Sequence, residues 1–579
     1  MDFRGGRKRD ALIASAPAAG KSHNISGAER VRFTAPAGND RAGRRPWWVW
    51  AAPFGVTLGV LLARNAFLFT TREYERADMG ANSILIEQAR RFSLLTGNYS
   101  RTGFNHPGPA FLYVESWGES VFWALLHLVP TAWNGQLIAL YGLNALFAAC
   151  VVAVGYGWTR SARGALAAGA VTGCFAALHP PAFSSDWMPY AYVLPFLVFL
   201  VSAGSVAAGQ HRDAWIAALS GWFLVHGHAA FLFIVPALAL SLLALRAAPR
   251  LSRRPCGWLA RRFPPAPQAR RLPLSSPAGA RRSWLAAAVI SALFALPMVL
   301  ELALHGDGNF ARYFAYGSSK SAGGHSAAQV TGFVLWFWWP RANAWLVPAL
   351  LAGAAAALAW RQPPGPPRAF CRWLLVASAL AAVLVTGYAA AGVDVITDDY
   401  IGYFAWGIPA ALLLVIVTAL AELPRPRSAG SRAPAAAGTA LAAAAAVTAV
   451  AAFAAAPAAR TSTAEVDPLN PRAGYPTDPA LPAVVARMAA LAAGRTIVLS
   501  FPHDGWTDVT GILVQASRTG VAACVAAPQW AFLMSQPSIC TPAQARGGYR
   551  MTVYPDSSAP PGVHPVARLA RALVTSGSK

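Results

Sequence analysis

Charged side chains are scarce in this sequence. Asp, Glu, Lys and Arg make up 12% of the 579 residues, whereas 55% of the residues are hydrophobic. A soluble domain carries roughly 25% charged residues, so this composition excludes an ordinary soluble protein and indicates a polytopic membrane protein. Carboxylates are the scarcer charge, with 24 Asp and Glu against 48 Lys and Arg, so a local concentration of them is informative.

The sequence also lacks the motifs of several common enzyme classes. It contains no Walker loop, no dinucleotide fingerprint after a strand, no HExxH and no GxSxG, each of which would support a soluble-type catalytic centre. The segments expected to face the cytoplasm are too short to hold a catalytic domain that uses nucleotide sugars. No internal repeat is evident, which argues against a transporter built from duplicated halves.

The excess of positive charge does not indicate a nucleic-acid partner. The net charge is +24, but the Arg residues lie in short runs between apolar stretches of about 20 residues, as in the cytoplasmic loops of membrane proteins. We therefore expect a lipid bilayer as the surroundings and no nucleic acid as a partner. Residues 1–46 are basic and rich in Gly, Ser and Ala, which predicts a disordered cytoplasmic N-terminus and not a cleavable signal peptide.

Eleven apolar runs are long enough to cross about 30 Å of hydrocarbon. If the N-terminus is cytoplasmic, the inside segments hold 29 of the 48 Lys and Arg, and the outside loops between spans hold 8. The positive-inside rule therefore favours eleven spans with the C-terminus outside. A single helix over 214–246 would place the Arg-rich segment 246–282 outside, so two spans are favoured there. The runs lie near 47–68, 133–158, 164–180, 190–209, 214–228, 229–246, 284–304, 342–360, 373–392, 401–421 and 437–457.

Two further apolar segments fall on the expected outer side without fitting as spans. The run 110–130 carries Glu115 and Glu119, and the run 327–340 ends in a cluster of Trp residues. Trp rings prefer the headgroup level, so both runs are predicted to be helices lying in the membrane interface. Such helices would form the walls of a cavity that opens to the outer leaflet.

A change to a Pro-rich and polar composition near residue 458 marks a second domain. Residues 47–457 would thus form the membrane domain, and 458–579 an extracytoplasmic domain. Alternating helix and strand patterns predict a small α/β fold for the latter. We expect helices at Pro482–Ala493 and Val509–Ser517, and strands at Thr496–Phe501, Val521–Ala526 and Tyr549–Tyr554.

Two of the six cysteines, Cys524 and Cys540, lie in this second domain. In an oxidising exterior compartment they would form a disulfide, worth about 3 kcal/mol in the chain-entropy model. The alternative is a pair of buried free thiols.

The loop after the first span concentrates the sparse carboxylates. Glu73, Glu75 and Asp78 follow that span closely, and Glu87 comes next. A carboxylate in this position can act as a general base that takes a proton from an acceptor hydroxyl, or it can solvate the loop. The first three residues are therefore candidate catalytic groups, with solvation as the alternative.

The same loop contains Asn105-His106-Pro107-Gly108-Pro109. Two prolines and a glycine restrict this backbone, so the side chains of Asn105 and His106 are predicted to point into one cavity. His106 would bind a phosphate as a cation or donate a hydrogen bond to a sugar. Alternatively, it caps the interfacial helix that begins near Pro109.

Together these features resemble the GT-C superfamily of integral membrane glycosyltransferases, which use polyprenyl-phosphate sugars. The shared features are a long acidic external loop with interfacial helices, about eleven spans and a terminal exterior domain, and the stretch 99–111 is similar to one found in a bacterial subgroup. The resemblance implies an all-α polytopic fold over about 45–457 and an essential Asp or Glu in the first external loop. Asp78 matches that position best, and Glu75 and Glu73 stay open because no Asp-x-Asp pair occurs there.

An enzyme of this kind holds the phosphate of its lipid-linked donor with cations on the outer side, where Lys and Arg are scarce in this chain. The candidates are Arg72, Arg76, Arg101 and Arg341, with snorkelling to the interface as the alternative for each. No cofactor is certain, and a divalent metal ion is left open.

Two other outer loops carry acidic side chains. Asp186 precedes Trp187, and a carboxylate beside an aromatic ring is common in sugar sites, although Trp also anchors helices at the interface. Asp398 and Asp399 belong to a second cluster, which would bind an acceptor sugar or a divalent ion, or merely mark the membrane boundary.

Three ionisable residues within the spans need separate interpretations. His226 and His228 form only a weak metal signal without a third ligand, so contacts between helices are favoured for them. Glu301 lies near the outer end of its span, where a carboxylate is costly unless it is paired or faces water, so we expect it to line the cavity.

The sequence therefore predicts a multi-pass enzyme of a bacterial inner (cell) membrane. It would transfer a hexose or pentose from a polyprenyl-phosphate donor to a glycan, lipid or protein acceptor of the cell envelope, on the outer face. One alternative is a transporter or flippase of lipid-linked glycans, against which the scarcity of charge within the spans argues. The other is a non-catalytic envelope assembly protein whose function lies in residues 458–579.

Overall fold

The computed structural model describes residues 45–251, 277–306, 308–319, 324–338, 345–422, 433–456 and 477–577. Helices make up most of these residues, and one small sheet lies in the C-terminal part that is described. The N-terminal segment 1–46, expected to be disordered, lies outside the described residues except for its last two positions.

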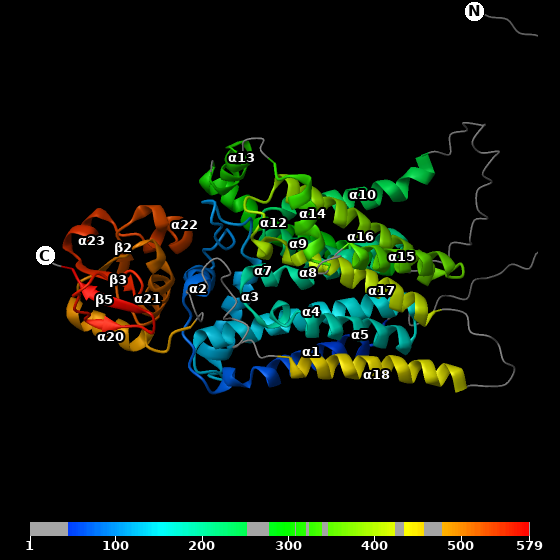
Figure 1. Ribbon diagram of the computed structural model, residues 1–579, viewed down its shortest axis with the longest axis horizontal. Helices are drawn as coiled ribbons and strands as arrows, with labels where there is room; N and C mark the ends of the chain where they lie inside the picture. The colour runs from blue at the N-terminus through cyan, green and yellow to red at the C-terminus, as the bar shows by residue number, and fades with distance from the viewer. Residues whose placement is uncertain are drawn as a thin grey trace, which may run out of the picture. The chain divides into compact units, whose positions relative to one another are not determined.

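Helices occupy the eleven apolar runs that the sequence predicts as spans, and Figure 1 shows them running side by side. In the described part of the chain, seven segments are long and apolar enough to cross a membrane by length and composition. The other runs form shorter helices of 14 to 17 residues. The helices are α1 (Trp48–Arg64), α4 (Ala132–Thr159), α5 (Ala162–Leu178), α8 (Val193–Ala208), α9 (Ala214–Gly227), α10 (Phe231–Leu251), α12 (Pro277–His305), α15 (Leu346–Arg361), α16 (Pro366–Ala391), α17 (Gly407–Ala421) and α18 (Ala433–Ala455).

Local signals set where several of these helices begin and end. Arg160 ends α4 in the left-handed conformation. Ser161 then caps α5, because its side chain accepts a hydrogen bond from the backbone N–H of Gly164 at 3.1 Å. As predicted, α9 and α10 are separate helices, and the extended backbone of His228 ends the first of them.

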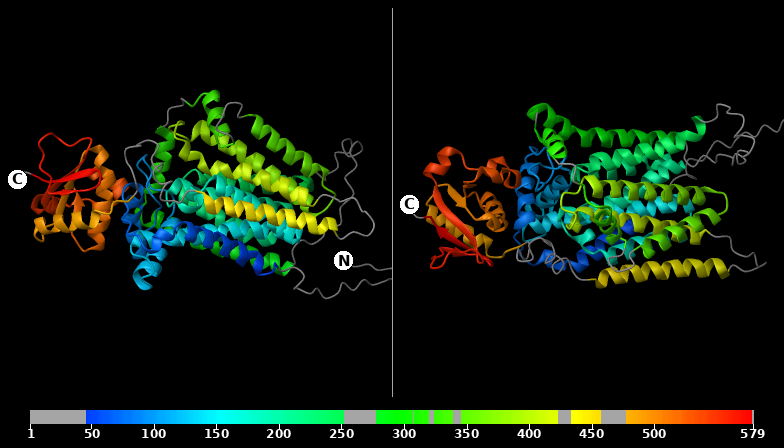
Figure 2. Two further views of the ribbon diagram at one scale, coloured as in Figure 1. Left: turned by 60° about the horizontal axis from the view of Figure 1, so that its bottom comes forward. Right: turned by 45° about the horizontal axis from the view of Figure 1, so that its top comes forward.

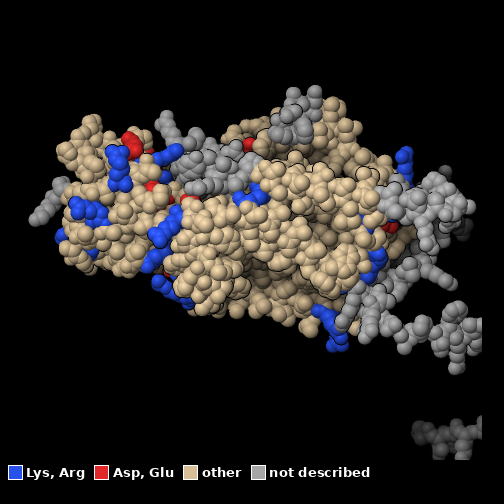
Figure 3. Space-filling view, turned by 90° about the horizontal axis from the view of Figure 1, so that it is seen from below, with Lys and Arg blue, Asp and Glu red and all other residues tan. Residues whose placement is uncertain are grey.

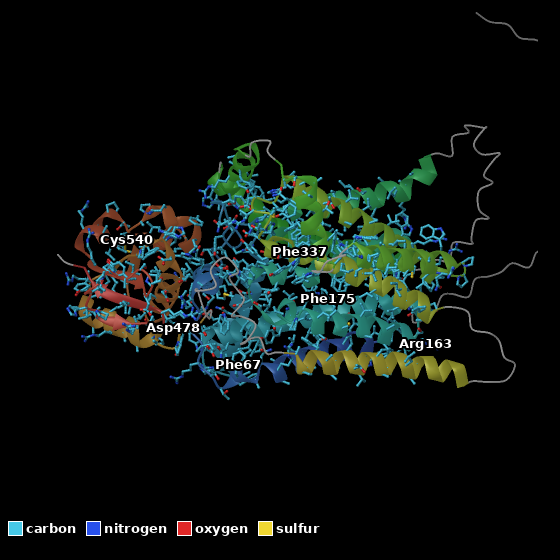
Figure 4. The ribbon with its side chains drawn as sticks, viewed as in Figure 1. Phe67, Arg163, Phe175, Phe337, Asp478 and Cys540 are labelled. Carbon is cyan, nitrogen blue, oxygen red and sulfur yellow. A yellow bond between two sulfur atoms is a disulfide. The ribbon has the colours of Figure 1, made fainter. Side chains whose placement is uncertain are left out.

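The surface of the helical part is largely free of charge. Figure 3 shows a broad tan area over these helices, with Lys and Arg gathered toward its ends. Phe67 and Arg163, labelled in Figure 4, lie at opposite ends of the bundle. Large apolar side chains are exposed between these ends, among them Phe233 (72% exposed) and Leu293 (63%). A bilayer is the environment in which such a surface is stable, so the structure is that of a multi-pass membrane protein.

Shorter elements connect the long helices. The segment between α1 and α4, predicted to be the first outer loop and called by that name below, contains α2 (Ala77–Arg90), α3 (Ala110–Gly118) and the π-helix η3 (Glu119–Leu125). The two segments predicted to lie in the interface correspond to α3 with η3 and to α14 (Ala327–Trp336). The remaining connecting elements are η2 (Ala66–Phe69), α6 (Pro181–Ser184), α7 (Met188–Ala191), η4 (His211–Asp213), α13 (Asn309–Ser319) and η5 (Asp399–Trp406).

The C-terminal domain is the small α/β fold that the sequence predicts. Its five-stranded sheet has the order β2-β1-β3-β5-β4, and the strands can be followed in Figure 2. β1 pairs in parallel with β2 and β3, whereas β5 pairs antiparallel with β3 and β4. The last two strands were not predicted. The elements are α20 (Leu481–Ala492), β1 (Ile497–Ser500), η7 (His503–Gly505), α21 (Trp506–Arg518), β2 (Ala523–Val525), η8 (Pro528–Trp530), α22 (Ala531–Met534), η9 (Gln536–Ser538), α23 (Pro542–Gly547), β3 (Tyr549–Pro555), β4 (Ala567–Arg568) and β5 (Ala572–Ser576).

Helix α2, which the sequence did not predict, belongs to two apolar cores. Met79 packs with the membrane helices, whereas Ala81 joins the core of the C-terminal domain. The contact with α21 is close, because a Cβ added at Gly80 would lie 2.7 Å from Oγ1 of Thr510. The C-terminal domain therefore packs directly on the first outer loop.

Candidate functional site

A cavity of about 580 Å³ lies where the first outer loop meets the C-terminal domain. Its lining includes residues from within the loop segment 98–106, from 187–192, from the end of α16 and the start of η5, and from the segments 503–506 and 530–533 of the C-terminal domain, but not every residue of these ranges. Aromatic side chains are numerous there, and Asp78, Arg101, Asp394 and Asp504 are the Asp and Arg residues of the described lining. In such a cavity, aromatic rings can stack against a sugar, and carboxylates can accept hydrogen bonds from its hydroxyls.

The segments expected to wall the cavity do not line it. Neither 110–130 nor 327–338 contributes to the described lining. Glu115 and Glu119 are instead buried, with 2% and 0% exposure. This part of the prediction is wrong. The cavity forms between the first outer loop and the C-terminal domain, which packs on that loop although it is distant in the sequence.

Asp78 is the candidate base that reaches this cavity. It lies in the first turn of α2, where the helix dipole favours a negative charge. Trp187 donates its indole N–H to Oδ2 of Asp78 at 2.7 Å, and the hydroxyl of Tyr99 donates to Oδ1. These donors orient the carboxylate, whose oxygens have further lone pairs that can accept a hydrogen bond from a substrate hydroxyl.

Glu75 and Glu73, the other two candidate bases, do not line the cavity. Glu75 is fully buried, accepts a hydrogen bond from Ser83 at 2.6 Å and forms an ion pair with Arg518 at a nitrogen–oxygen distance of 2.7 Å. Glu73 is also buried and accepts a hydrogen bond from the hydroxyl of Thr477 at 2.7 Å. Both carboxylates therefore contact the C-terminal domain instead of the cavity.

Arg518, in the last turn of α21, is the centre of a buried ion cluster. Besides Glu75, it faces Glu119 and Glu87, at nitrogen–oxygen distances of 3.3 and 3.6 Å. Arg90 reaches the same two carboxylates, at 2.9 Å from Glu119 and 3.5 Å from Glu87. Burial acts against the charged guanidinium of Arg518, but the carboxylates outweigh it and raise the pKa of Arg518 above its ordinary value. The cluster ties the first outer loop to the C-terminal domain.

Arg101 is the predicted phosphate-binding cation that lines the cavity. Its guanidinium donates two hydrogen bonds to Asp394, at 3.0 and 2.8 Å, and also pairs with Asp398. Although partial burial opposes it, this pairing lowers the pKa of Asp394. A phosphate would have to compete with both carboxylates, so Arg101 is better placed to join the two outer loops than to hold a donor. Asp398 and Asp399 do not line the cavity.

Two of the other predicted cations lie away from the cavity. Arg76 is buried, pairs with Asp508 at 3.2 Å and donates a hydrogen bond to Thr507 at 3.0 Å. Arg72 is exposed and does not line the cavity. Arg341 lies outside the described residues.

His106 lines the cavity, whereas its neighbour Asn105 does not. The backbone N–H of Asn105 donates to Oδ1 of Asn309 on α13 at 2.7 Å. His106 is buried, and its Nδ1 accepts a hydrogen bond from the backbone N–H of Ala229 at 3.2 Å. Burial, together with the neighbouring His228, lowers the pKa of His106 well below its ordinary value. The lowered pKa favours a neutral ring, which can donate a hydrogen bond, over the imidazolium of the other alternative.

The cap of α3 comes from a different histidine than the one predicted. The backbone N–H of Ala110 donates to Nδ1 of His226 at 3.2 Å, and Nε2 of His226 lies 2.8 Å from the carbonyl oxygen of Phe294. Gly108 is required here, because a Cβ would lie 2.4 Å from Nδ1 of the His226 ring. His226 thus makes the helix contacts expected of it, whereas His228 lines the cavity, a position that the sequence did not predict.

Asp186 does not line the cavity, although its neighbour Trp187 does. The indole N–H of Trp133 donates to Oδ2 of Asp186 at 2.6 Å. Burial raises the pKa of Asp186 to about 7. Glu301, also expected in the cavity, instead pairs with a histidine one turn along its helix at 2.7 Å. Neither carboxylate is therefore placed to contact a ligand there.

The C-terminal domain supplies a part of the lining that the sequence did not predict. His503 and Asp504 come from η7, and Trp530 and Phe532 come from η8 and α22. The rings of Trp530 and Phe532 are stacked with centroids 6.1 Å apart, and the ring of Phe532 lies 6.2 Å from that of Tyr99. No local sequence pattern marks a contact between segments that lie about 400 residues apart.

The carboxylates and histidines of the described ranges do not form a metal site. No three His, Cys, Asp or Glu side chains there are grouped so that they could hold a metal ion. Zinc sites use three or four protein ligands, whereas Mg²⁺ is often held by one or two carboxylates together with substrate phosphates.

Cys524 and Cys540 form a disulfide in the C-terminal domain. It joins β2 to the segment before α23, where the backbone N–H of Cys540 also donates to the carbonyl of Val525 at 2.9 Å. Figure 4 labels Cys540 within this domain. A domain closed by a disulfide suits an oxidising compartment.

The fold and the site together define a multi-pass α-helical membrane protein whose aromatic-lined cavity is closed by an α/β domain. Among solved structures, the chain is similar to the apo crystal structure of ArnT from Cupriavidus metallidurans. The two share 13% sequence identity with a TM-score of 0.48, over 92% of this chain and 99% of that chain. No protein-family model and no curated protein sequence matches the chain.

Proposed function

We propose that this protein is a membrane glycosyltransferase that moves a sugar from a polyprenyl-phosphate donor to a cell-envelope acceptor, which is a glycan, a lipid or a protein. The observation that carries the proposal is the position of Asp78. Of the three candidate carboxylates in the first outer loop, Asp78 is the one that reaches the aromatic-lined cavity. The resemblance of the sequence to the GT-C superfamily, in which this loop carries an essential acidic residue, agrees with that position.

In the proposed reaction Asp78 takes the proton of an acceptor hydroxyl while the hydroxyl oxygen attacks the anomeric carbon of the donor. The bond between the anomeric carbon and the phosphate oxygen breaks, and the polyprenyl phosphate leaves with the bonding electrons. Attack opposite to the leaving group inverts the configuration. Trp187 and Tyr99 hold the Asp78 carboxylate through the hydrogen bonds that they donate to it, so a bound hydroxyl meets an oriented base.

The proposal places the cavity on the outer face of a bacterial inner membrane. Support comes from the distribution of Lys and Arg, which favours a cytoplasmic N-terminus, and from the disulfide of the C-terminal domain. The aromatic side chains of that domain, Trp530 and Phe532, would then contact the acceptor from the side opposite to the membrane helices.

The experiment is a transfer assay with purified protein, radiolabelled polyprenyl-phosphate sugars and envelope acceptors. Asp78→Asn is expected to lower kcat at least about 100-fold, because an amide cannot take the proton. Glu73→Gln is the matched control, since it also exchanges a loop carboxylate for an amide but lies outside the cavity, and it should retain wild-type turnover. Transfer by the Asp78→Asn variant at the wild-type rate would refute the role of Asp78.

The same preparation distinguishes the alternatives. If no donor supports transfer but proteoliposomes move a labelled lipid-linked sugar across the bilayer, the flippase alternative is favoured. If neither activity occurs and removal of the carboxylate of Asp78 leaves envelope assembly in cells intact, a non-catalytic role of the C-terminal domain is favoured.

A further inference from the structure

His106 and His228 form a pair of rings on the wall of the cavity. Their ring centroids lie 4.5 Å apart, and the ring planes are inclined by 31°. The two residues come from distant parts of the chain, His106 from the first outer loop and His228 from the break between α9 and α10. The reaction proposed above assigns no role to this pair.

Backbone hydrogen bonds fix the tautomer of both rings. Nδ1 of His106 accepts from the backbone N–H of Ala229, and Nδ1 of His228 accepts from that of Ala230, each at 3.2 Å. A nitrogen that accepts a hydrogen bond carries no proton, so a neutral imidazole held in this way has its proton on Nε2. Within the described ranges Nε2 of neither ring has a hydrogen-bond partner. Two adjacent N–H donors are therefore available to a ligand.

Such a pair matches a chemical group that only accepts hydrogen bonds. A sugar hydroxyl both donates and accepts, and the acceptor nitrogens of these two rings are already used by the backbone. The two non-bridging oxygens of a phosphodiester accept only, and rings 4.5 Å apart can each reach one of them. Arg101, the cation of the cavity, is already engaged by Asp394 and Asp398, so the histidine pair is the better match for the phosphate.

We propose that His106 and His228 bind the phosphodiester of the lipid-linked donor through two neutral Nε2–H donors and so position the leaving group. The identity of the ligand rests on the proposed function, whereas the pair of donors is a property of the fold. Negative charge grows on the phosphate oxygens as the glycosidic bond breaks, and fixed donors aimed at these oxygens stabilise that charge.

The test measures binding of monomethyl farnesyl phosphate, a diester with one negative charge that does not titrate near neutral pH. Binding to the purified full-length protein is followed by quenching of Trp fluorescence, since Trp187, Trp506 and Trp530 line the cavity. His106→Asn and His228→Asn keep an oxygen near the position of Nδ1 but remove the Nε2–H donor. Each is expected to weaken the affinity about tenfold, as for a lost hydrogen bond to a charged group.

Two controls separate this effect from a change in the fold. Farnesol has the same tail without the phosphate, so it should bind the wild type and both variants alike. His226→Asn removes a ring whose two nitrogens both contact protein atoms, so it should lower the melting temperature while the folded protein keeps its affinity for the diester.

Several outcomes would overturn the proposal. One is unchanged affinity for the diester in both the His106→Asn and the His228→Asn variant. A second is an affinity of the wild type that rises as the pH falls below neutral, with no such rise in either histidine variant. This pH dependence would indicate that an imidazolium binds the diester. Tyr192, Tyr388 and Asp394 are the ionisable groups beside His228, so the same profile is measured in both variants. A third is loss of binding on addition of EDTA, which indicates a bound metal.

The binding assay needs no sugar transfer, so its result is independent of the proposed function. A protein that transfers no sugar but loses diester affinity in the two variants would still confirm the pair of donors. A protein that transfers sugar with unchanged diester affinity in the variants would refute the pair and leave the transferase proposal standing.

Discussion

Arg518 lies 2.7 Å from Glu75, in a buried ion pair that joins the last turn of α21 to the start of the first outer loop. Beside it, the backbone N–H of Asp478, labelled in Figure 4, donates to the carbonyl of Tyr74 at 2.8 Å. The C-terminal domain is thereby held on the loop that carries Asp78. One wall of the cavity therefore depends on contacts made by residues that do not line it.

Replacing Arg518 is expected to loosen this contact. Arg518→Met would leave Glu75 buried without its ion-pair partner, while Glu119 keeps Arg90, and a stranded buried charge costs about 3–5 kcal/mol. The effect should appear as a lower melting temperature and as faster proteolysis between the two domains. Glu75→Gln in the Arg518→Met background should recover part of the loss, because it removes the stranded charge.

Arg568 offers a matched control for this prediction. It pairs with Asp556 at 3.5 Å, but both side chains are exposed, at 63% and 45%. Exposed ion pairs contribute little to stability, so Arg568→Met should leave the melting temperature near that of the wild type. Equal effects of the Arg518 and Arg568 substitutions would contradict the importance of the buried cluster.

Trp187 is expected to act by positioning Asp78. Trp187→Phe keeps an aromatic ring in the cavity but removes the N–H that Asp78 accepts. If the transferase proposal holds, kcat should fall about tenfold, as for a lost hydrogen bond to a charged group, with little change in KM. Trp117→Phe, at a position that is 59% exposed and outside the cavity lining, should leave both constants unchanged. A rise in KM alone would instead indicate that the Trp187 ring binds substrate.

The disulfide is expected to stabilise the C-terminal domain. Cys524 and Cys540 are 16 positions apart, and closing a loop of about this length contributes about 3 kcal/mol in the chain-entropy model. Cys524→Ala with Cys540→Ala should therefore lower the melting temperature. Cys174→Ala, which changes an exposed free thiol, is the control. Intact mass after alkylation under denaturing, non-reducing conditions reports the bond directly, and labelling of all cysteines would exclude it.

Asp186 is expected to make stability depend on pH. Burial raises its pKa from an ordinary value of 3.8 to about 7 in the folded protein. Between these values the unfolded chain releases a proton that the folded protein holds, so the contribution of Asp186 to stability falls as the pH rises from about 4 to about 7. Asp186→Asn does not ionise and still accepts from Trp133. The free energy of unfolding of this variant relative to the wild type should rise by a few kcal/mol across this interval. The difference in melting temperature between the two proteins, measured at each pH, reports this rise. A constant difference would contradict this account.

Several features of the fold follow from the sequence because the signals are local. An apolar run of about 20 residues favours a helix that can span a bilayer wherever it occurs, so helices lie at the predicted runs in the described part of the chain. The alternating patterns after residue 458 likewise predicted α20, α21 and three of the five strands. Strand β4 has two residues, too few for such a pattern to be recognised, and β5 was missed although it has five.

The roles of the individual site residues were decided by contacts between distant parts of the chain. Glu75 and Asp78 are only three positions apart, yet Glu75 meets Arg518 and Asp78 meets Trp187. Composition and spacing could identify the loop with the scarce carboxylates, because both are properties of neighbouring residues. Which carboxylate faces the cavity depends on where α21 packs on α2, and only the tertiary structure brings those helices together.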